Sequence, residues 1–203
     1  MVLPKQEASK LLGPHYDSII LCFKDAWKSW EKFGELAPTC KKPLDSTTRA
    51  NFIWNHVKEN VKKRFKKVAG AIIRERGRLF ALDVNGVALL RFKKVDSKHR
   101  ASNIPTDQQL DLQMHFRKTQ SVLPGFPDEA TWLTCGYKLD ELETKITDCV
   151  ITCFVGGILE YVIPLGSQNV IADIFKAAEP VSSKAKVSPI SAAQEVKKNK
   201  KQT

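Results

Sequence analysis

The sequence predicts an α+β fold, with two N-terminal helices, a β-hairpin, a short helix, three further antiparallel strands, a C-terminal helix and a disordered tail. Three observations carry this prediction. Apolar residues recur every three or four positions in the first third of the chain, alternating residues flank Asn85-Gly86, and apolar residues become rare after about residue 180. With 203 residues, 42% of them hydrophobic, the chain can bury the core of one domain, which we place at residues 1–180.

Two amphipathic helices are expected near the N-terminus. The first lies between His15 and Phe33, where one face carries Tyr16, Ile20, Phe23, Trp27 and Trp30. Its tryptophans are expected in the core, although such rings can also stack on bases. The second begins at the capping pair Asp45-Ser46 and ends near Gly77, with an apolar stripe of Ile53, Val57, Val61, Phe65, Val68 and Ile72.

A β-hairpin is predicted around Asn85-Gly86, because a type I′ turn needs positive φ at both central residues. This turn would join residues 78–84 to residues 87–95. It would pair Val84 with Val87, and further along Phe80 with Arg91 and Arg78 with Lys93. The string RFKKV occurs at 64–68 and again at 91–95, but the first copy is expected on a helix and the second on a strand, so it is not a structural repeat.

The remaining elements follow a loop at residues 96–105. Thr106 and Gln109 form a capping-box pattern that predicts a short helix to about Lys118. Strands are expected at 131–137, 145–154 and 158–165, the last two joined by a tight turn at Gly156-Gly157. A last helix is expected at 170–178. Residues 181–203 are rich in lysine and poor in apolar residues, which predicts a disordered tail.

Positive charge is concentrated in one part of the chain. The net charge is +11, and residues 51–100 alone contribute +10, from 14 basic and four acidic side chains, whereas residues 101–150 contribute −4. A localised basic region favours a polyanionic partner such as DNA or RNA, or an acidic protein surface. A solvated lysine-rich face is the alternative explanation.

Ten basic residues are the candidate nucleic-acid contacts. On the second helix the lysines are expected away from the apolar stripe, and on the hairpin the basic side chains are expected to share one face near its open end. The loop after the hairpin extends the set. The candidates are Lys58, Lys62, Lys63, Lys66, Lys67, Arg78, Arg91, Lys93, Lys98 and Arg100.

The sequence carries none of the common catalytic or metal-binding motifs. The sequence contains no H-E-x-x-H, G-x-S-x-G, Walker or G-x-G-x-x-G motif, and its four histidines are far apart, so we expect neither a metal nor a cofactor. A metal-dependent nuclease is the enzyme class still open, with carboxylates of Glu75, Asp83 and Asp96 near Lys93, although their spacing does not match such a site.

Cysteine content and hydropathy predict a cytoplasmic protein. The five cysteines form no C-x-x-C pair, the N-terminus does not resemble a signal peptide, and no apolar run reaches the roughly 18 residues of a membrane span. Free thiols and no membrane association are therefore expected.

The runs RLFALDVNGVALLRFKKVD, SNIPTDQQLDLQ and LPGFPDEATWLTCGYKLDELETKITDCVITC resemble a group of small bacterial proteins of unassigned activity. The resemblance covers residues 78–165. It implies a place in toxin–antitoxin or phage-defence operons, beside regulators with helix-turn-helix or ImmA/IrrE-like metallopeptidase domains, and it implies no catalytic residues. A partner protein from the same operon is then expected.

Together these observations predict a non-catalytic binding protein, antitoxin-like or regulatory, whose basic face contacts phosphates or an acidic partner. The alternative is a subunit of a multi-protein complex that has no nucleic-acid role, in which the basic charge only keeps the chain in solution.

Overall fold

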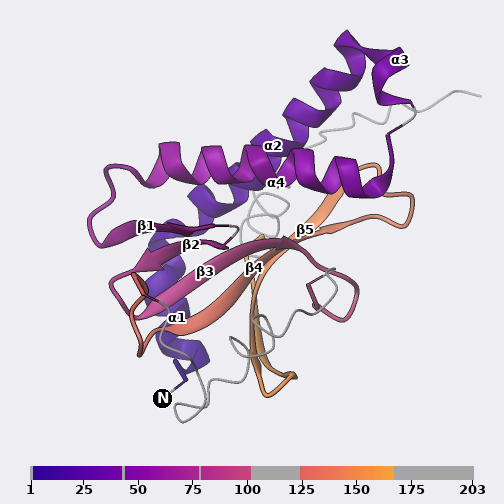
Figure 1. Ribbon diagram of the computed structural model, residues 1–203. Helices are drawn as coiled ribbons and strands as arrows, with labels where there is room; N and C mark the ends of the chain where they lie inside the picture. Colours follow the sequence, from indigo (N-terminus) through magenta and orange to yellow (C-terminus); the bar gives the residue numbers. More distant parts are fainter. Residues whose placement is uncertain (1, 43, 78, 102–123, 167–203) are drawn as a thin grey trace, which may run out of the picture.

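Helices cover one face of a six-stranded sheet in the computed structural model, which describes residues 2–42, 44–77, 79–101 and 124–166 (Figure 1). The helical elements are α1 (Lys5–Leu12), the 3₁₀ turn η1 (Gly13–His15), α2 (Tyr16–Leu36), α3 (Pro38–Lys41) and α4 (Ser46–Phe65). The strands are β1 (Ala71–Arg76), β2 (Leu79–Val84), β3 (Ala88–Lys94), β4 (Thr131–Leu139), β5 (Ile146–Val155) and β6 (Ile158–Pro164). The predicted α+β class is confirmed.

The six strands lie in the sheet in their sequence order. Neighbouring strands are antiparallel except β3 and β4, which are parallel and pair from Ala88 with Thr131 to Lys94 with Tyr137. The three later strands are those expected from the sequence, and β5 pairs antiparallel with both β4 and β6. Gly156 and Gly157 have φ of 58° and 80°, so the β5–β6 turn depends on glycine as predicted.

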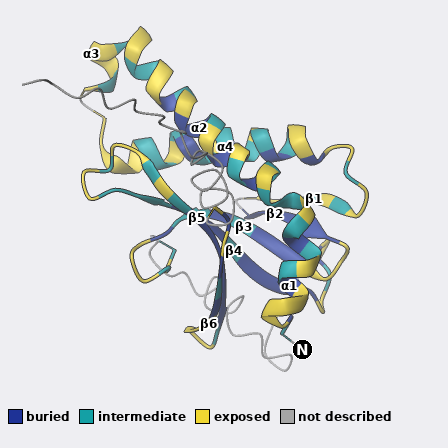
Figure 2. Cartoon of the chain, turned by 180° about the vertical axis from the view of Figure 1, so that it is seen from behind, coloured by how far each residue is buried: buried dark blue, intermediate teal, exposed yellow. Residues whose placement is uncertain are grey.

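The core lies between the sheet and the helices α2 and α4, where Figure 2 shows buried residues on the facing surfaces. The ring of Phe23 on α2 lies 5.9 Å from that of Phe92 on β3 and 5.4 Å from that of Tyr137 on β4. Trp27 and Trp30 are only 7% and 6% exposed. The two tryptophans therefore belong to the core, as expected from their place on the apolar stripe of α2.

The N-terminal segment is hydrogen-bonded to strands β4 and β6. The backbone N–H of Leu3 donates to Oγ1 of Thr131 at 2.8 Å, and the hydroxyl of Tyr161 donates to the carbonyl of Leu3 at 2.8 Å. The helix α1 that follows was not expected from the sequence. Its buried residues, Ala8 and Leu12, are too few to form the long stripe that predicted the other helices.

The second helix is shorter than predicted, because Ala71–Arg76 forms the edge strand β1 rather than its last turns. The helix ends at Phe65, and Gly70, with φ of 75°, lies in the turn that leads into β1, where its carbonyl accepts a hydrogen bond from the N–H of Asn85 at 2.7 Å. A Cβ at Gly70 would lie 1.8 Å from Oδ1 of Asn85. Pairing with β2 therefore overrides the helical spacing of Val68 and Ile72.

The hairpin forms at Asn85-Gly86, with φ of 56° and 69°, but its predicted register is wrong by one residue. Val84 pairs with Ala88, not with Val87, because Val87 belongs to the turn and is 42% exposed. The carboxylate of Asp83 accepts the N–H of Gly86 at 2.7 Å and fixes this turn. The shift moves every β3 side chain to the other face relative to β2.

The corrected register separates the apolar and basic side chains of β3. Phe92, not Arg91, shares a face with Phe80, and their ring centroids are 6.3 Å apart. Arg91 and Lys93 therefore lie on the face of the sheet opposite the helices, which we call the second face. The predicted short helix at 106–118, the C-terminal helix at 170–178 and the tail at 181–203 lie outside the described residues.

Candidate polyanion-binding surface

The helix α4 presents the largest group of the predicted contact residues. Asp45 caps its N-terminus by accepting the N–H of Thr48 at 2.7 Å. The predicted stripe is buried along its full helical length, at Ile53, Val57, Val61 and Phe65. Because these four side chains face the sheet, the lysines between them lie on the sides of the helix or point toward solvent.

Two of the lysines are tied to the neighbouring strand. The ammonium groups of Lys58 and Lys62 both contact the carboxylate of Glu75 on β1, with a Lys62 Nζ to Glu75 Oε2 distance of 3.1 Å. The hydrogen bond from Lys58 lowers the pKa of Glu75, and the hydrogen bond to Glu75 raises the pKa of Lys62. These contacts hold α4 against β1, so part of the predicted basic face has an internal counter-charge.

Lys58 also contacts aromatic rings. Its Nζ lies 5.5 Å from the ring centroid of Trp54 and 5.8 Å from that of Phe80. A lysine that contacts two rings and a carboxylate stabilises the packing of α4. We therefore assign Lys58 a structural role.

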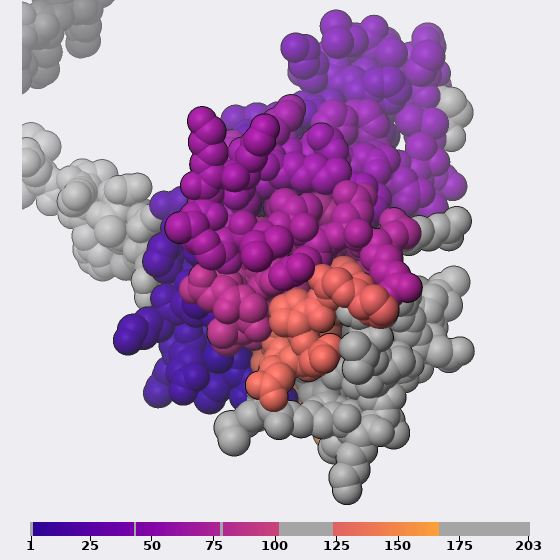
Figure 3. Space-filling model, turned by 60° about the vertical axis from the view of Figure 1, so that its left-hand side comes forward, coloured from indigo at the N-terminus to yellow at the C-terminus, as the bar shows by residue number. Residues whose placement is uncertain are grey.

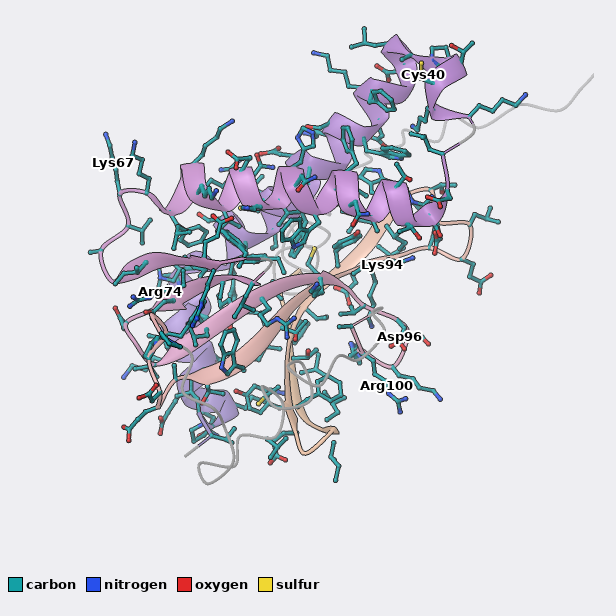
Figure 4. The ribbon with its side chains drawn as sticks, in the orientation of Figure 1. Cys40, Lys67, Arg74, Lys94, Asp96 and Arg100 are labelled. Carbon is teal, nitrogen blue, oxygen red and sulfur yellow. The ribbon has the colours of Figure 1, made fainter. Side chains whose placement is uncertain are left out.

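Three further lysines lie at the C-terminal end of the helix and in the turn after it. Lys63, Lys66 and Lys67 are exposed, and none forms an ion pair within the described part of the chain. Figure 4 shows Lys67 extending away from the fold where α4 gives way to β1. We call these three residues the basic end of α4.

Two arginines that were not among the candidates lie near the basic end of α4. Arg64 contacts Asp25 of α2, with an Nη2 to Oδ2 distance of 2.5 Å, and Arg76 is exposed at the end of β1. The net charge of residues 58–76 is +6, from eight basic and two acidic side chains. Figure 3 brings this side forward and shows the purple atoms of α4 and the turn after it at the surface. The local charge density is the signal in the sequence that could have identified Arg76.

Arg91 and Lys93 occupy a different surface, the second face of the sheet. Both are half-buried, and burial lowers the pKa of each. Burial and, to a smaller extent, the charge of Arg91 lower the pKa of Lys93 to about 8. The structure therefore brings these two cations together, but on the side of the sheet away from α4.

Lys98 and Arg100 lie in the turn after β3, at a third place. This turn is closed by the carboxylate of Asp96, which accepts the N–H of Arg100 at 2.8 Å, and both basic side chains are exposed. Figure 4 places Arg100 and Lys67 on opposite sides of the molecule. Arg78 lies outside the described residues. The ten candidates thus do not form one continuous face.

The carboxylates considered for a nuclease site all have structural contacts. Asp83 is fully buried and bonded to Arg74 and to the N–H of Gly86, Glu75 contacts two lysines, and Asp96 closes its own turn. No group of three or more His, Cys, Asp or Glu side chains that could hold a metal ion occurs within the described ranges. The geometry of these residues gives no support to metal-dependent catalysis.

Comparisons with known proteins do not place this chain in a family. No helix in the described part of the chain is both long and apolar enough to cross a membrane. The resemblance to small proteins of defence operons gains no support from the comparisons and stays a prediction. No protein-family model, no curated protein and no solved structure matches this chain.

Proposed function

We propose that this protein is a non-catalytic binding protein that contacts the phosphates of a nucleic acid with the basic end of α4. One observation carries the proposal. Lys63, Lys66 and Lys67 are exposed, have no ion-pair partner among the described residues, and follow one another at the end of a helix that is buried along its opposite side. Arg76 extends the same positive region onto the edge of the sheet.

The helix macrodipole explains only part of this concentration of positive side chains. Cations near a helix C-terminus interact favourably with the macrodipole, each by about 0.3–1 kcal/mol at a surface. However, like charges three or four residues apart oppose helix formation by a few tenths of a kcal/mol per pair. A bound polyanion would relieve this repulsion, and the internal carboxylate Glu75 reaches only Lys58 and Lys62.

Contacts of this kind would give affinity rather than sequence specificity, because phosphates carry no base identity. An antitoxin-like or regulatory role would fit such binding, since it needs no catalytic group. The five free cysteines are compatible with the reducing cytoplasm that the sequence predicts.

A charge-reversal variant tests the proposal. Lys63→Glu/Lys66→Glu/Lys67→Glu is compared with Lys5→Glu/Lys10→Glu/Lys28→Glu, which changes the net charge equally at exposed lysines of α1 and α2. Lys62 is left intact because its replacement would also break the contact with Glu75. Binding to labelled duplex DNA and single-stranded RNA is measured at several salt concentrations.

The proposal predicts that wild type binds with a log K that falls linearly with log salt, by about 0.9 per phosphate contacted on duplex DNA. The Lys63, Lys66 and Lys67 variant should lose most of the affinity, and its slope should flatten by about 2.7 if each lysine contacts one phosphate. The control variant should keep the wild-type slope. Equal slopes and affinities for all three proteins would refute the proposal.

A further inference from the structure

A groove of about 540 Å³ lies at the other end of α4. Its walls come from the C-terminal half of α2, from α3 and the segment after it, from the start of α4, and from the turn between β4 and β5. Along α4, Arg49 in the groove and Lys63 at the basic end are separated by about 21 Å, from the rise of 1.5 Å per residue. The groove is therefore separate from the proposed nucleic-acid contacts.

The floor of the groove is aromatic and firmly held. Trp27 and Trp30 both line it, and the Nε1–H of Trp27 donates to Oε1 of Glu31 at 2.9 Å. The ring of Trp30 packs against that of Phe52, with centroids 5.4 Å apart and an edge-to-face geometry. Because both rings are almost fully buried, the floor is shaped before any ligand arrives.

Lys41 covers the exposed side of Trp30. Its Nζ lies 4.8 Å from the ring centroid, a cation–π distance. The side chain passes over Gly34, where a Cβ would lie 2.3 Å from Cδ and Nζ of Lys41. Gly34 therefore provides the space that lets Lys41 lie along the groove, and a larger residue there would displace Lys41 and fill part of the groove.

The opposite wall is a turn that is fixed by hydrogen bonds. The carboxylate of Asp140 accepts the N–H groups of Thr144 and Lys145 at 2.6 and 3.1 Å. Glu143, with φ of 53°, contacts both Arg49 of α4 and Lys94 of β3. These contacts bind the turn to two other elements, so the groove has a defined width.

Exposed leucines lie along the rim of this groove. Leu142, at the tip of the β4–β5 turn, is 82% exposed, and Leu44 is 36% exposed. Leu36, two residues before Pro38 of the groove wall, is 75% exposed. Leu44 and Leu142 therefore give the rim of the groove two apolar side chains that a ligand could cover.

The charges of the groove select the chemistry of that ligand. Of its two carboxylates, Glu143 is paired with Arg49 and Lys94, whereas Glu31 accepts a hydrogen bond from the uncharged indole of Trp27 and keeps its charge. Lys42 also lines the groove and forms no ion pair with any described residue, and Lys41 contacts only an uncharged ring. The charged side chains that line the groove are three basic ones (Lys41, Lys42 and Arg49) and two acidic ones (Glu31 and Glu143), so the lining has a net charge of +1, which complements a carboxylate on the ligand.

We propose that this groove binds a short peptide segment of another protein, with a large apolar side chain placed beside acidic residues. The apolar side chain would pack against Leu44 and Leu142 at the rim, beside the Lys41 side chain that covers Trp30, and the carboxylates would meet Lys41 and Lys42. The volume falls within the usual range for ligand sites of about 300–1,000 Å³. A nucleobase fits less well, because Lys41 already occupies the free face of Trp30. The proposal goes beyond nucleic-acid binding and does not depend on it.

Selection from a library of random peptides displayed on phage tests the proposal with the full chain. Two variants alter the groove without touching the core. Gly34→Leu fills it from the floor, and Leu142→Asp places a negative charge on its rim. The control is Ile158→Asp, an equivalent change at an aliphatic side chain that is 73% exposed at the start of β6. The circular dichroism spectrum of each variant confirms that it is folded.

The proposal predicts enrichment of peptides that combine an aromatic or long aliphatic residue with Asp or Glu. A synthetic copy of an enriched peptide should change the tryptophan fluorescence of wild type, and its Kd should rise about tenfold or more in both groove variants. The Ile158→Asp control should bind like wild type. If Gly34→Leu does not fold, Leu142→Asp alone decides.

Three outcomes would overturn the proposal. They are no enrichment, enrichment of basic peptides, and enriched peptides that bind both groove variants normally. Competition by a mononucleotide at the same site would assign the groove to nucleotides instead. The Lys63, Lys66 and Lys67 variant should keep peptide binding, and Leu142→Asp should keep nucleic-acid binding, so the two proposals fail separately.

Discussion

The guanidinium of Arg74 on β1 donates two hydrogen bonds to Oδ2 of Asp83 on β2, at 2.9 and 3.1 Å. Asp83 is fully buried, and its other oxygen accepts the N–H of Gly86. One carboxylate thus joins the edge strand to its neighbour and fixes the β2–β3 turn. A fully buried carboxylate in this position depends on Arg74, the one cation that contacts it among the described residues.

Removal of that cation should destabilise the fold strongly. Arg74→Met leaves the Asp83 carboxylate buried without a counter-charge, and we expect the free energy of unfolding to fall by about 3–5 kcal/mol. Adding Asp83→Asn should restore part of this loss, because an amide keeps the acceptor for Gly86 without the charge. Urea unfolding of the two single variants and the double variant measures the coupling. Additive losses would show that the pair is not coupled.

The stability of the protein should depend on pH through Lys93. Burial lowers its pKa from the ordinary value of 10.5 to about 8 in the folded state. Between pH 8 and 10.5 Lys93 is therefore protonated more often in the unfolded chain than in the folded protein. The free energy of unfolding consequently rises with pH in this range. Below pH 8 Lys93 is charged in both the folded and the unfolded state, so the full cost of burying this charge lowers the free energy of unfolding.

Comparison with Lys93→Met isolates this effect from other groups that titrate at alkaline pH. Methionine removes the charge and keeps the apolar part of the side chain. The variant should gain stability relative to wild type near pH 7, and this advantage should shrink as pH rises from 8 toward 10. Unfolding by urea at each pH gives the difference. An advantage that is constant or grows with pH would contradict the lowered pKa.

The thiols should differ sharply in reactivity. Cys40 on α3 is exposed, whereas Cys22, Cys135, Cys149 and Cys153 are buried. Burial raises the pKa of Cys22 and Cys149 to about 12 and that of Cys153 to about 11, so little thiolate forms at these sites near neutral pH.

Labelling with iodoacetamide at pH 8 should therefore modify one thiol in the native protein and five after unfolding. Intact-mass spectrometry counts the labels. The Cys40→Ser variant should remain unlabelled while folded and should take four labels when unfolded. Rapid native labelling of any second cysteine would show that the core opens at that position.

Local signals in the sequence located most of the elements correctly. Asn85-Gly86 and Gly156-Gly157 specify positive φ, which few other residues adopt, so both turns could be placed without knowledge of the rest of the chain. The stripe from Ile53 to Phe65 had the right period and became buried as expected. Propensity and periodicity were sufficient where the structure depends on residues close in sequence.

Prediction failed where distant pairing decides the structure. Val68 and Ile72 continue a helical spacing, but hydrogen bonding between β1 and β2 gives residues 71–76 an extended conformation. The register of the hairpin depends on the side chain of Asp83, which no rule for a two-residue turn includes. A shift of one residue then placed Arg91 and Lys93 on the opposite face from the one predicted.

The candidate site was predictable as a charge density but not as a surface. The sequence shows that lysines are concentrated between residues 58 and 67. It does not show that Glu75 on the adjacent strand contacts two of them and neutralises part of their charge. The groove was invisible in the sequence, since Leu142 and Trp30 are more than a hundred residues apart and meet only because β4 and β5 reach the end of α2.

The unbroken helix α4 has a consequence for assembly. It holds two surfaces of different chemistry at a fixed separation, with no hinge between them. A nucleic acid at one end and a peptide at the other would not collide, so both could be held at once in a ternary complex. In that arrangement the chain would act as a rigid adaptor that sets the spacing between its two ligands.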